Sequence, residues 1–144
     1  MTVERKITWL FASNAVINWT VSVRGILDPI GMAAMFGAAA PNYPSIVRLW
    51  QGFVFMFGCM FWEVCRDPRR KIALIKYNWI EKTITALAIT GGYLVGELPL
   101  RLMLLIILTN WAWIPLLLYY DVALRAAMRQ PGVPPAPGSQ WAPA

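Results

Sequence analysis

The chain has 144 residues and a formal net charge of +6, and 58% of its residues are hydrophobic while only 14% are charged. Its mean hydropathy is +0.52. A soluble domain of this size buries only part of its surface, so this composition excludes an ordinary soluble globule and predicts an integral membrane protein. The eight Trp and five Tyr residues fit that prediction, because their amphipathic rings favour the membrane–water interface.

Four stretches have the length and apolar content of a transmembrane helix, and they predict an all-α, four-helix membrane bundle. They cover about residues 7–27, 45–65, 72–96 and 100–124. Asn14, Asn18 and Arg24 interrupt the first stretch, which follows Arg5 and Lys6 as a signal peptide would. The nearest small-residue cleavage site, Ala38–Ala40, lies far downstream, so we favour an uncleaved span over a signal peptide.

The positive charges predict the orientation of the spans. Five of the thirteen basic residues fall in one short segment in and just after the connection between the second and third spans, namely Arg66, Arg69, Arg70, Lys71 and Lys76. Arg5 and Lys6 precede the first span, and Arg125 and Arg129 follow the fourth. Positively charged segments stay in the cytoplasm, so we expect both termini there. Because the basic residues encode topology and form no binding stripe, nucleic acid is not an expected partner.

Two segments outside the spans have their own signatures. Asp28 followed by Pro29 is a favourable helix start, and the apolar residues up to Gly37 predict a short interfacial helix that folds over the outer end of the bundle. Residues 129–144 contain Pro131, Pro134, Pro135, Pro137 and Pro143. The chain therefore divides into a transmembrane domain, 1–128, and a disordered, Pro-rich cytoplasmic tail, 129–144, that is either merely solvated or binds a partner domain.

Polar residues inside spans are costly, and a helical step of 100° places several of them on shared faces. Asn14 and Asn18 share one face of the first helix. In the second helix Arg48, Gly52, Cys59 and Glu63 form a stripe flanked by Gln51. The third helix has a stripe of small and polar residues, which consists of Asn78, Glu81, Thr85, Ala88, Gly92 and Gly96. Gly92 and Gly96 form a GxxxG motif, which predicts close helix packing.

Depth along the spans separates two charged clusters. The outer cluster predicts a ligand site for a carboxylate, phosphate or quinone oxygen, because planar arginines suit such oxygens; it consists of Arg24, Asp28, Arg48, Gln51, Glu97 and Arg101. The inner cluster is a candidate proton relay and consists of Glu63, Glu81, Lys82 and Asp121. Both clusters have a plainer interpretation, in which ion pairs and snorkelling side chains only hold the helices together.

The absence of histidine narrows the kinds of cofactor, metal site and catalytic group that the chain supports. It removes the usual axial ligand of haem and the commonest general base, so we expect no cofactor and no catalytic residue can be assigned. Glu63, Glu81 and Asp121 are a poor metal set without histidine, and no metal is expected. Cys59 and Cys65 are six residues apart and both fall in a span, so we expect two buried, unpaired thiols.

The stretch from Gly25 to Gly58 reads Gly25, Pro29, Phe36-Gly37, Arg48, Gly52 and Gly58. A small residue and a proline that close a first span, an apolar piece that ends in Phe-Gly, and an arginine that opens a second, glycine-bearing span resemble the DoxX-like group of small bacterial four-helix membrane proteins. The resemblance covers about half of the chain. It implies a four-helix bundle in a bacterial inner membrane and an accessory role in a redox system.

Two functions follow from these observations. The favoured one is a non-catalytic accessory protein or subunit of a membrane complex, or a homo-oligomer, whose partners are other membrane subunits and the lipid bilayer. The alternative is a small membrane enzyme or carrier that binds a lipophilic, oxygen-bearing molecule, such as a quinone, a lipid or a sterol-like compound, at the outer arginine cluster. A pocket lined by Arg24, Arg48 and Arg101 would favour the alternative, and internal pairing of the charges would favour the accessory role.

Overall fold

The computed structural model describes residues 3–129, and every regular element in this range is a helix. The bounds of the elements are α1 (Val3–Leu27), α2 (Pro29–Met35), α3 (Pro44–Arg66), α4 (Ile72–Leu94), α5 (Leu100–Ile106), the π-helical turn η1 (Ile107–Trp111) and α6 (Trp113–Met128). The predicted all-α class is confirmed, and a helix lies over each of the four predicted spans. The predicted tail lies outside the described residues, apart from Arg129.

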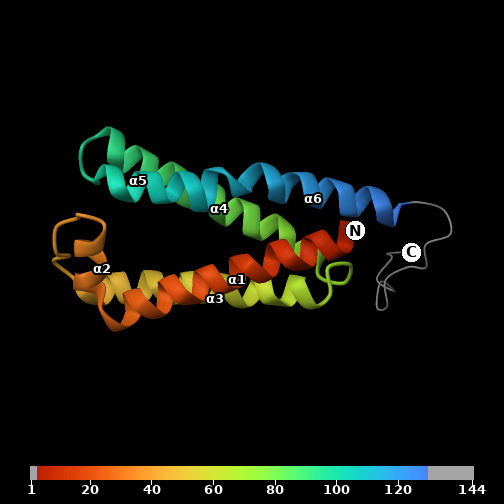
Figure 1. Cartoon of the computed structure of the whole chain (residues 1–144), viewed down its shortest axis with the longest axis horizontal. Helices are drawn as coiled ribbons and strands as arrows, with labels where there is room; N and C mark the ends of the chain where they lie inside the picture. Colours follow the sequence, from red (N-terminus) through yellow and green to blue (C-terminus); the bar gives the residue numbers. More distant parts are fainter. Residues whose placement is uncertain (1–2, 130–144) are drawn as a thin grey trace, which may run out of the picture.

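The long helices form two layers (Figure 1). One layer consists of α1 and α3, which share the most extensive helix–helix interface of the molecule, and the other pairs α4 with α5, η1 and α6. Because the connections are short, the chain runs up and down four times. The start of α1, the α3–α4 connection and the end of α6 therefore lie at one end, and α2 lies at the other (Figure 1).

The short helix α2 begins as the sequence predicts. The Asp28 side chain accepts a hydrogen bond of 2.8 Å from the backbone N–H of Gly31, and Pro29 occupies the first helical turn, where its missing N–H costs nothing. Gly37, with a φ of +73°, ends the segment in the left-handed region that favours glycine. The α2 segment contacts α1 and α3 and so extends the first layer at this end of the molecule.

The tightly packed core lies at the end opposite α2. Its fully buried members come from α1, α3, α4 and α6, and they are Ile7, Phe11, Ala15, Phe61, Val64, Ile75, Leu117 and Leu124. The rings of Phe11 and Phe61 lie with centroids 5.5 Å apart across the α1–α3 interface. Gly58 permits that interface, because a Cβ at this position would lie 2.7 Å from the Trp19 ring. One half of the bundle is thus solidly filled, while the half near α2 is not.

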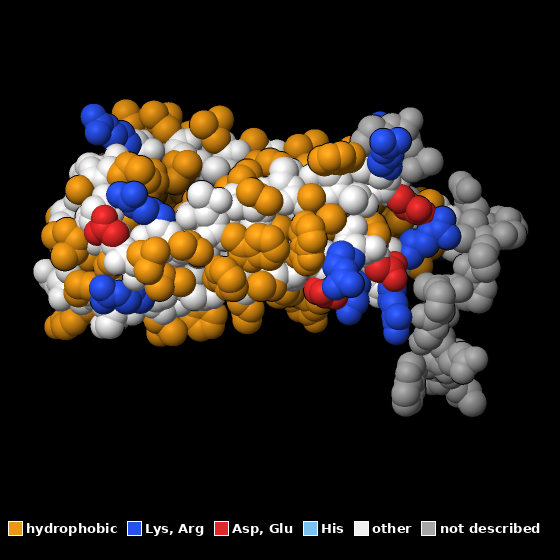
Figure 2. Space-filling model, turned by 60° about the horizontal axis from the view of Figure 1, so that its bottom comes forward, with side chains coloured by type: hydrophobic (Ala, Val, Ile, Leu, Met, Phe, Trp, Pro, Cys, Tyr) orange, Lys and Arg blue, Asp and Glu red, His pale blue; other side chains and the backbone are white. Residues whose placement is uncertain are grey.

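The outer surface of the molecule is apolar. Two of its helical stretches, Pro44–Arg66 and Leu100–Met128, are long and apolar enough to cross a membrane, and both are mostly exposed on the outside. Large side chains such as Ile46, Leu49, Phe53 and Tyr119 are at least half exposed. Figure 2 shows Lys, Arg, Asp and Glu side chains at the two ends of the face in view, with hydrophobic side chains along the length between them. This distribution supports association with a membrane.

The buried face of α3 differs from the predicted one. The buried residues of α3 are Gln51, Gly58, Phe61 and Val64. Cys59, in contrast, is exposed, and a Cβ on Gly52 would meet nothing within 4 Å. The expectation that both thiols are buried is therefore wrong: Cys59 is exposed and Cys65 is only half-buried. The physical reason is that bulky side chains and Gly58 pack on α1, and this packing decides the rotation of α3. Small and polar residues on the neighbouring stripe turn outward as a result.

Candidate functional site

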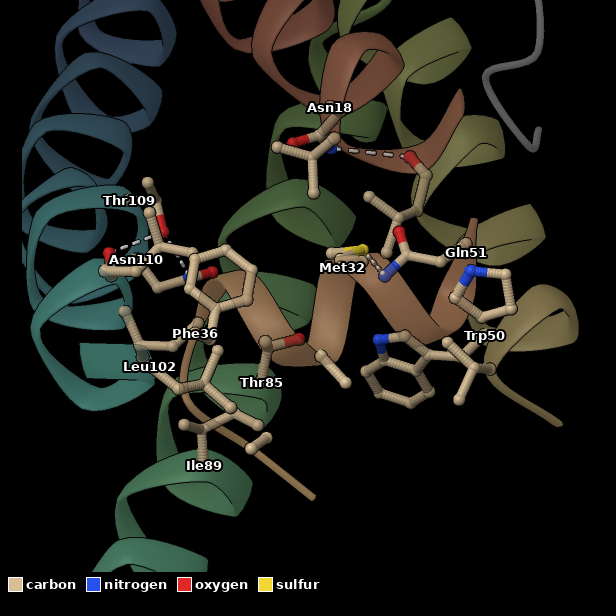
Figure 3. Close-up of a pocket in the computed structure, with 18 of the residues that line it drawn as sticks. Asn18, Met32, Phe36, Trp50, Gln51, Thr85, Ile89, Leu102, Thr109 and Asn110 are labelled. Carbon is tan, nitrogen blue, oxygen red and sulfur yellow. Dashed lines mark hydrogen bonds between the residues drawn. The ribbon is translucent and has the colours of Figure 1, made fainter. Parts of the chain in front are cut away.

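A cavity of about 290 Å³ lies between the two layers at the α2 end of the bundle. Its walls are mostly apolar and come from α1 to α5 and from η1. The α2 segment closes it with side chains such as Met32 and Phe36. Figure 3 shows the polar side chains Asn18, Gln51, Thr85 and Asn110 entering this space from four different helical segments. An apolar chamber with a few convergent polar groups has the composition of a small-molecule site.

One wall carries a polar network centred on Asn18 of α1. The Lys82 Nζ atom donates a hydrogen bond of 3.3 Å to Asn18 Oδ1, and Asn18 Nδ2 donates one of 3.5 Å to the Val54 carbonyl. Asn18 and Lys82 are both buried, at 4% exposed each. Through these two bonds Asn18 connects α1 to α3 and to α4. A buried ammonium needs such partners, so the network fixes the side chain of Lys82.

Glu81 completes the charge balance of this wall. Its Oε2 atom lies 3.9 Å from Lys82 Nζ, and its Oε1 atom accepts a hydrogen bond of 3.2 Å from the Thr85 hydroxyl. The Lys82 ammonium also lies 5.5 Å from the centroid of the Phe61 ring. The ammonium is thus surrounded by an amide oxygen, a carboxylate and an aromatic face, whereas Glu81 Oε2 is buried and accepts no hydrogen bond.

The opposite walls hold two amides whose oxygens lack partners. Gln51 Nε2 donates to the Met32 sulfur at 3.6 Å, and Asn110 Nδ2 donates to Thr109 Oγ1 at 3.0 Å. Their oxygens, Gln51 Oε1 and Asn110 Oδ1, are buried without a hydrogen bond. Both residues line the cavity and are less than one-tenth exposed. Buried polar atoms without partners are rare and costly, which points to a ligand or water at this place.

The π-helical turn η1 brings Asn110 to the cavity. Within this turn the Ala112 N–H donates to the Ile107 carbonyl five residues earlier, at 3.0 Å. Pro115 follows closely and offers no N–H to the carbonyl of Trp111, so a regular α-helix is interrupted here. The wider turn shifts the phase between α5 and α6 and puts Thr109 and Asn110 into the lining. Single π turns of this kind often lie at functional sites.

A second hollow of about 380 Å³ lies between α3 and α4 and adjoins the first. Its lining is almost wholly apolar and includes the exposed side chains of Phe53, Tyr77 and Ile84. The two hollows have four residues in common, namely Trp50, Val54, Glu81 and Thr85. Glu81 therefore lies where the cavity meets an apolar groove on the outer surface.

Among the predicted outer cluster, Gln51 lines the cavity and the charged members lie around its end of the molecule. Arg24 pairs with Asp28 at 3.5 Å, with both side chains more than half exposed. Arg48 Nε donates to the Ile26 carbonyl at 3.1 Å. Glu97 and Arg101 are exposed. Arg24, Arg48 and Arg101 do not line either hollow, so the pocket that would favour binding at the arginines is not formed by them.

Among the predicted inner cluster, only Glu81 and Lys82 come together. Glu63 pairs with Arg66 at 3.8 Å and with Lys71 at 3.6 Å, near the end of α3. Asp121 accepts a hydrogen bond of 2.7 Å from Arg125 one turn along α6. Each of these two carboxylates has its own arginine partner in the same helix, away from the Glu81–Lys82 pair. Within residues 3–129, no group of three or more His, Cys, Asp or Glu side chains is arranged to hold a metal ion.

The predicted packing glycines lie at the end of α4. Gly96 is beyond the last helical residue, with a φ of +78°, and the Glu97 N–H donates to the Gly92 carbonyl at 2.9 Å. A Cβ on Gly92 would lie 2.7 Å from the Leu98 side chain, so Gly92 makes room for the chain that turns back over it. Together the two glycines shape a helix-ending turn of the Schellman type.

Sequence reasoning missed part of the lining. Leu102, Leu105 and Ile106 of α5 face the cavity, but nothing in an unbroken apolar run distinguishes them from lipid-facing neighbours. Thr109 was also missed, although Pro115 hinted at a disturbed helix nearby. No family model, curated protein or solved structure matches the chain significantly. The site therefore has to be interpreted from its own geometry.

Proposed function

We propose that this protein is a small, multi-pass inner-membrane protein that binds a lipophilic molecule with a polar head in the cavity between its two helix layers. The observation that carries the proposal is the coincidence of an apolar cavity with buried polar atoms that make no hydrogen bond. Such atoms cost free energy in the empty state, and a bound molecule that satisfies them is favoured by that amount. No reaction is assigned to the site.

Four membrane spans are part of the proposal. Hydropathy alone supports α3 and the α5–α6 stretch. The lower hydropathy of α1 and α4 has a simple cause, because their polar side chains turn inward: Asn14, Asn18, Asn78 and Lys82 are all buried. At about 1.5 Å per residue, the 25 residues of α1 and the 23 of α4 are long enough to cross the hydrocarbon layer. The basic α3–α4 connection supports a cytoplasmic location for that end.

The ligand site is placed in the cavity in preference to the arginines. Arg24 and Arg48 already have Asp28 and the Ile26 carbonyl as partners and are exposed. The cavity, in contrast, has mostly apolar walls and buried amide oxygens that accept no hydrogen bond. The adjoining groove between α3 and α4 suits the apolar remainder of a long ligand. A proton relay is not proposed, because Glu63 and Asp121 pair elsewhere.

A non-catalytic accessory protein or subunit of a membrane complex is the second candidate. The exposed aromatic side chains of α3, among them Trp50, Phe53, Phe55 and Trp62, favour it, because such residues are enriched at protein interfaces. The same side chains would face lipid in an isolated protein, so we rank this function second. The resemblance to DoxX-like proteins belongs to the proposal as well and rests on the residues between Gly25 and Gly58.

Native mass spectrometry of the protein, purified in mild detergent, tests the proposal. We expect a stoichiometric small molecule on the wild type and on Leu104→Trp, because Leu104 lies on α5 but is 51% exposed. We expect its loss from Leu102→Trp, because Leu102 lines the cavity and the larger ring would fill it. A folded Leu102→Trp variant that retains the molecule would contradict the proposal, and a stoichiometric partner chain in its place would favour the second candidate.

A further inference from the structure

The buried polar atoms of the cavity that make no hydrogen bond are all of one kind. Gln51 Oε1, Glu81 Oε2 and Asn110 Oδ1 are hydrogen-bond acceptors, they come from α3, α4 and η1, and all three residues line the cavity. Each amide nitrogen donates one of its two N–H groups to the wall beside it. A bound molecule therefore meets oxygens that need donors.

The Lys82 ammonium, the charged donor of the cavity lining, already has three neighbours that stabilise it. Lys82 Nζ donates to Asn18 Oδ1, pairs with Glu81 and lies over the Phe61 ring. The Thr85 hydroxyl donates to Glu81 Oε1, and the Thr109 hydroxyl donates to the Leu105 carbonyl. A ligand carbonyl or ether only accepts hydrogen bonds and would leave all three oxygens without a donor.

We infer that the head group of the ligand is an uncharged hydrogen-bond donor, a hydroxyl, and that the site discriminates against carbonyl, ether and anionic heads. This inference rests on the proposed function and specifies its ligand class. A hydroxyl can donate to Glu81 Oε2 or to either amide oxygen, and two hydroxyls, as in a diol or hydroquinone, can satisfy two of them. An ammonium also donates, but Lys82 already balances Glu81, so a second buried cation would lack a counter-charge.

Long-chain probes of equal tail length separate these classes. We expect hexadecan-1-ol to bind the purified protein in lipid nanodiscs, and its methyl ether and the corresponding methyl ketone to bind about tenfold more weakly, as the loss of a donated hydrogen bond predicts. Hexadecylamine and palmitate, which carry charge, should bind more weakly than the alcohol. Binding is measured by native mass spectrometry and by the ligand-dependent shift of Tm.

Two variants test which side chains make the site prefer an alcohol to an ether. Gln51→Leu and Asn110→Leu replace an acceptor with an apolar group of similar size, and each should reduce the alcohol-to-ether ratio severalfold while ether binding persists. Asn14→Leu, a buried asparagine outside the cavity lining, is the matched control and should leave the ratio unchanged.

The possible failures are distinct. An ether or ketone that binds as tightly as the alcohol, with both lost in Leu102→Trp, would overturn the inferred head group and leave the proposed cavity site intact. Tighter binding of the amine or of palmitate would likewise overturn the inference. If none of the probes binds, or if Leu102→Trp binds them as the wild type does, the proposed function itself fails.

Discussion

At the scale of single residues, Asn18 is the junction of the bundle. Its amide links the Lys82 ammonium of α4 to the backbone of α3 at Val54, from a position in α1. Buried polar groups held in this way specify how helices align, because any other alignment would leave an ammonium without an acceptor. The junction lies between the filled core and the cavity, and it therefore holds the lining residues of α4 in place.

Replacing Asn18 by Leu should destabilise the fold by about 1–3 kcal/mol, because the buried Lys82 would lose its nearest acceptor. Asn14→Leu is the matched control. Asn14 is equally buried, but the hydrogen bond of its amide nitrogen stays within α1, to the Leu10 carbonyl at 3.2 Å, so we expect a change within about 1 kcal/mol. Unfolding in mixed micelles measures both values. Equal losses in the two variants would show that Asn18 has no special role.

The residue-level predictions succeeded where burial of a polar group decided the outcome. The phase analysis placed Asn14, Asn18 and Asn78 on interior faces, and all three are buried. It failed for Gly52 and Cys59, which are open or exposed. The difference is physical: a polar amide must turn inward in a membrane helix, whereas a small residue is tolerated on either face. The unpaired acceptors of the cavity were beyond prediction, because they depend on side-chain rotation.

At the scale of elements, the short helix α2 covers the cavity and depends on a single cap. The Asp28 carboxylate binds the Gly31 N–H at the start of α2. A helix this short is not stable in isolation, so the cap and the contacts with α1 and α3 hold it. Loss of the cap is therefore expected to loosen the segment that covers this side of the cavity.

Asp28→Ala should weaken α2 by about 1 kcal/mol, whereas Asp28→Asn should preserve most of its stability, since asparagine caps as well as aspartate does. Both changes remove the pair with Arg24, so their difference isolates the cap. Hydrogen exchange of the α2 amides should become several times faster in the alanine variant only. Identical exchange in the two variants would contradict a lid controlled by its cap.

The sequence predicted α2 and the four helices because capping residues and apolar runs are local signals. It did not predict η1. Pro115 indicates that a helix is disturbed, but the extra residue of a π turn can be absorbed at several places before the proline, and packing against α4 selects one. The lining contributed by α5 and η1 follows from that choice.

At the scale of the whole molecule, the two ends differ in charge. The end with the α3–α4 connection carries the larger share of Lys and Arg, and the end with α2 carries Arg24, Arg48 and Arg101. The bundle is thus electrically asymmetric along its long axis, which is the property that orients membrane proteins during insertion.

A cysteine-labelling experiment tests the proposed orientation. In a background with Cys59 and Cys65 replaced by Ser, Asn42→Cys lies in the α2–α3 connection and Asp67→Cys lies just after α3. A membrane-impermeant maleimide should label position 42 in intact bacterial cells and position 67 only after permeabilisation. The reverse pattern would invert the topology, and labelling of both positions in intact cells would contradict four spans.

The tightly packed core at one end limits how a bound molecule enters and leaves the cavity. The core closes the bundle at the end with the basic α3–α4 connection, through side chains that include Ile7, Phe11, Phe61 and Leu124. The cavity therefore does not continue through the molecule. The protein is therefore shaped as a cup and not as a channel. In a bilayer, its mouth would open at the α2 end, while its side groove runs along α3 and α4 past the middle of the spans, as far as Met60 and Tyr77. A tail in the groove would then lie against the membrane interior, and nothing bound in the cavity could pass to the basic end without displacing the core.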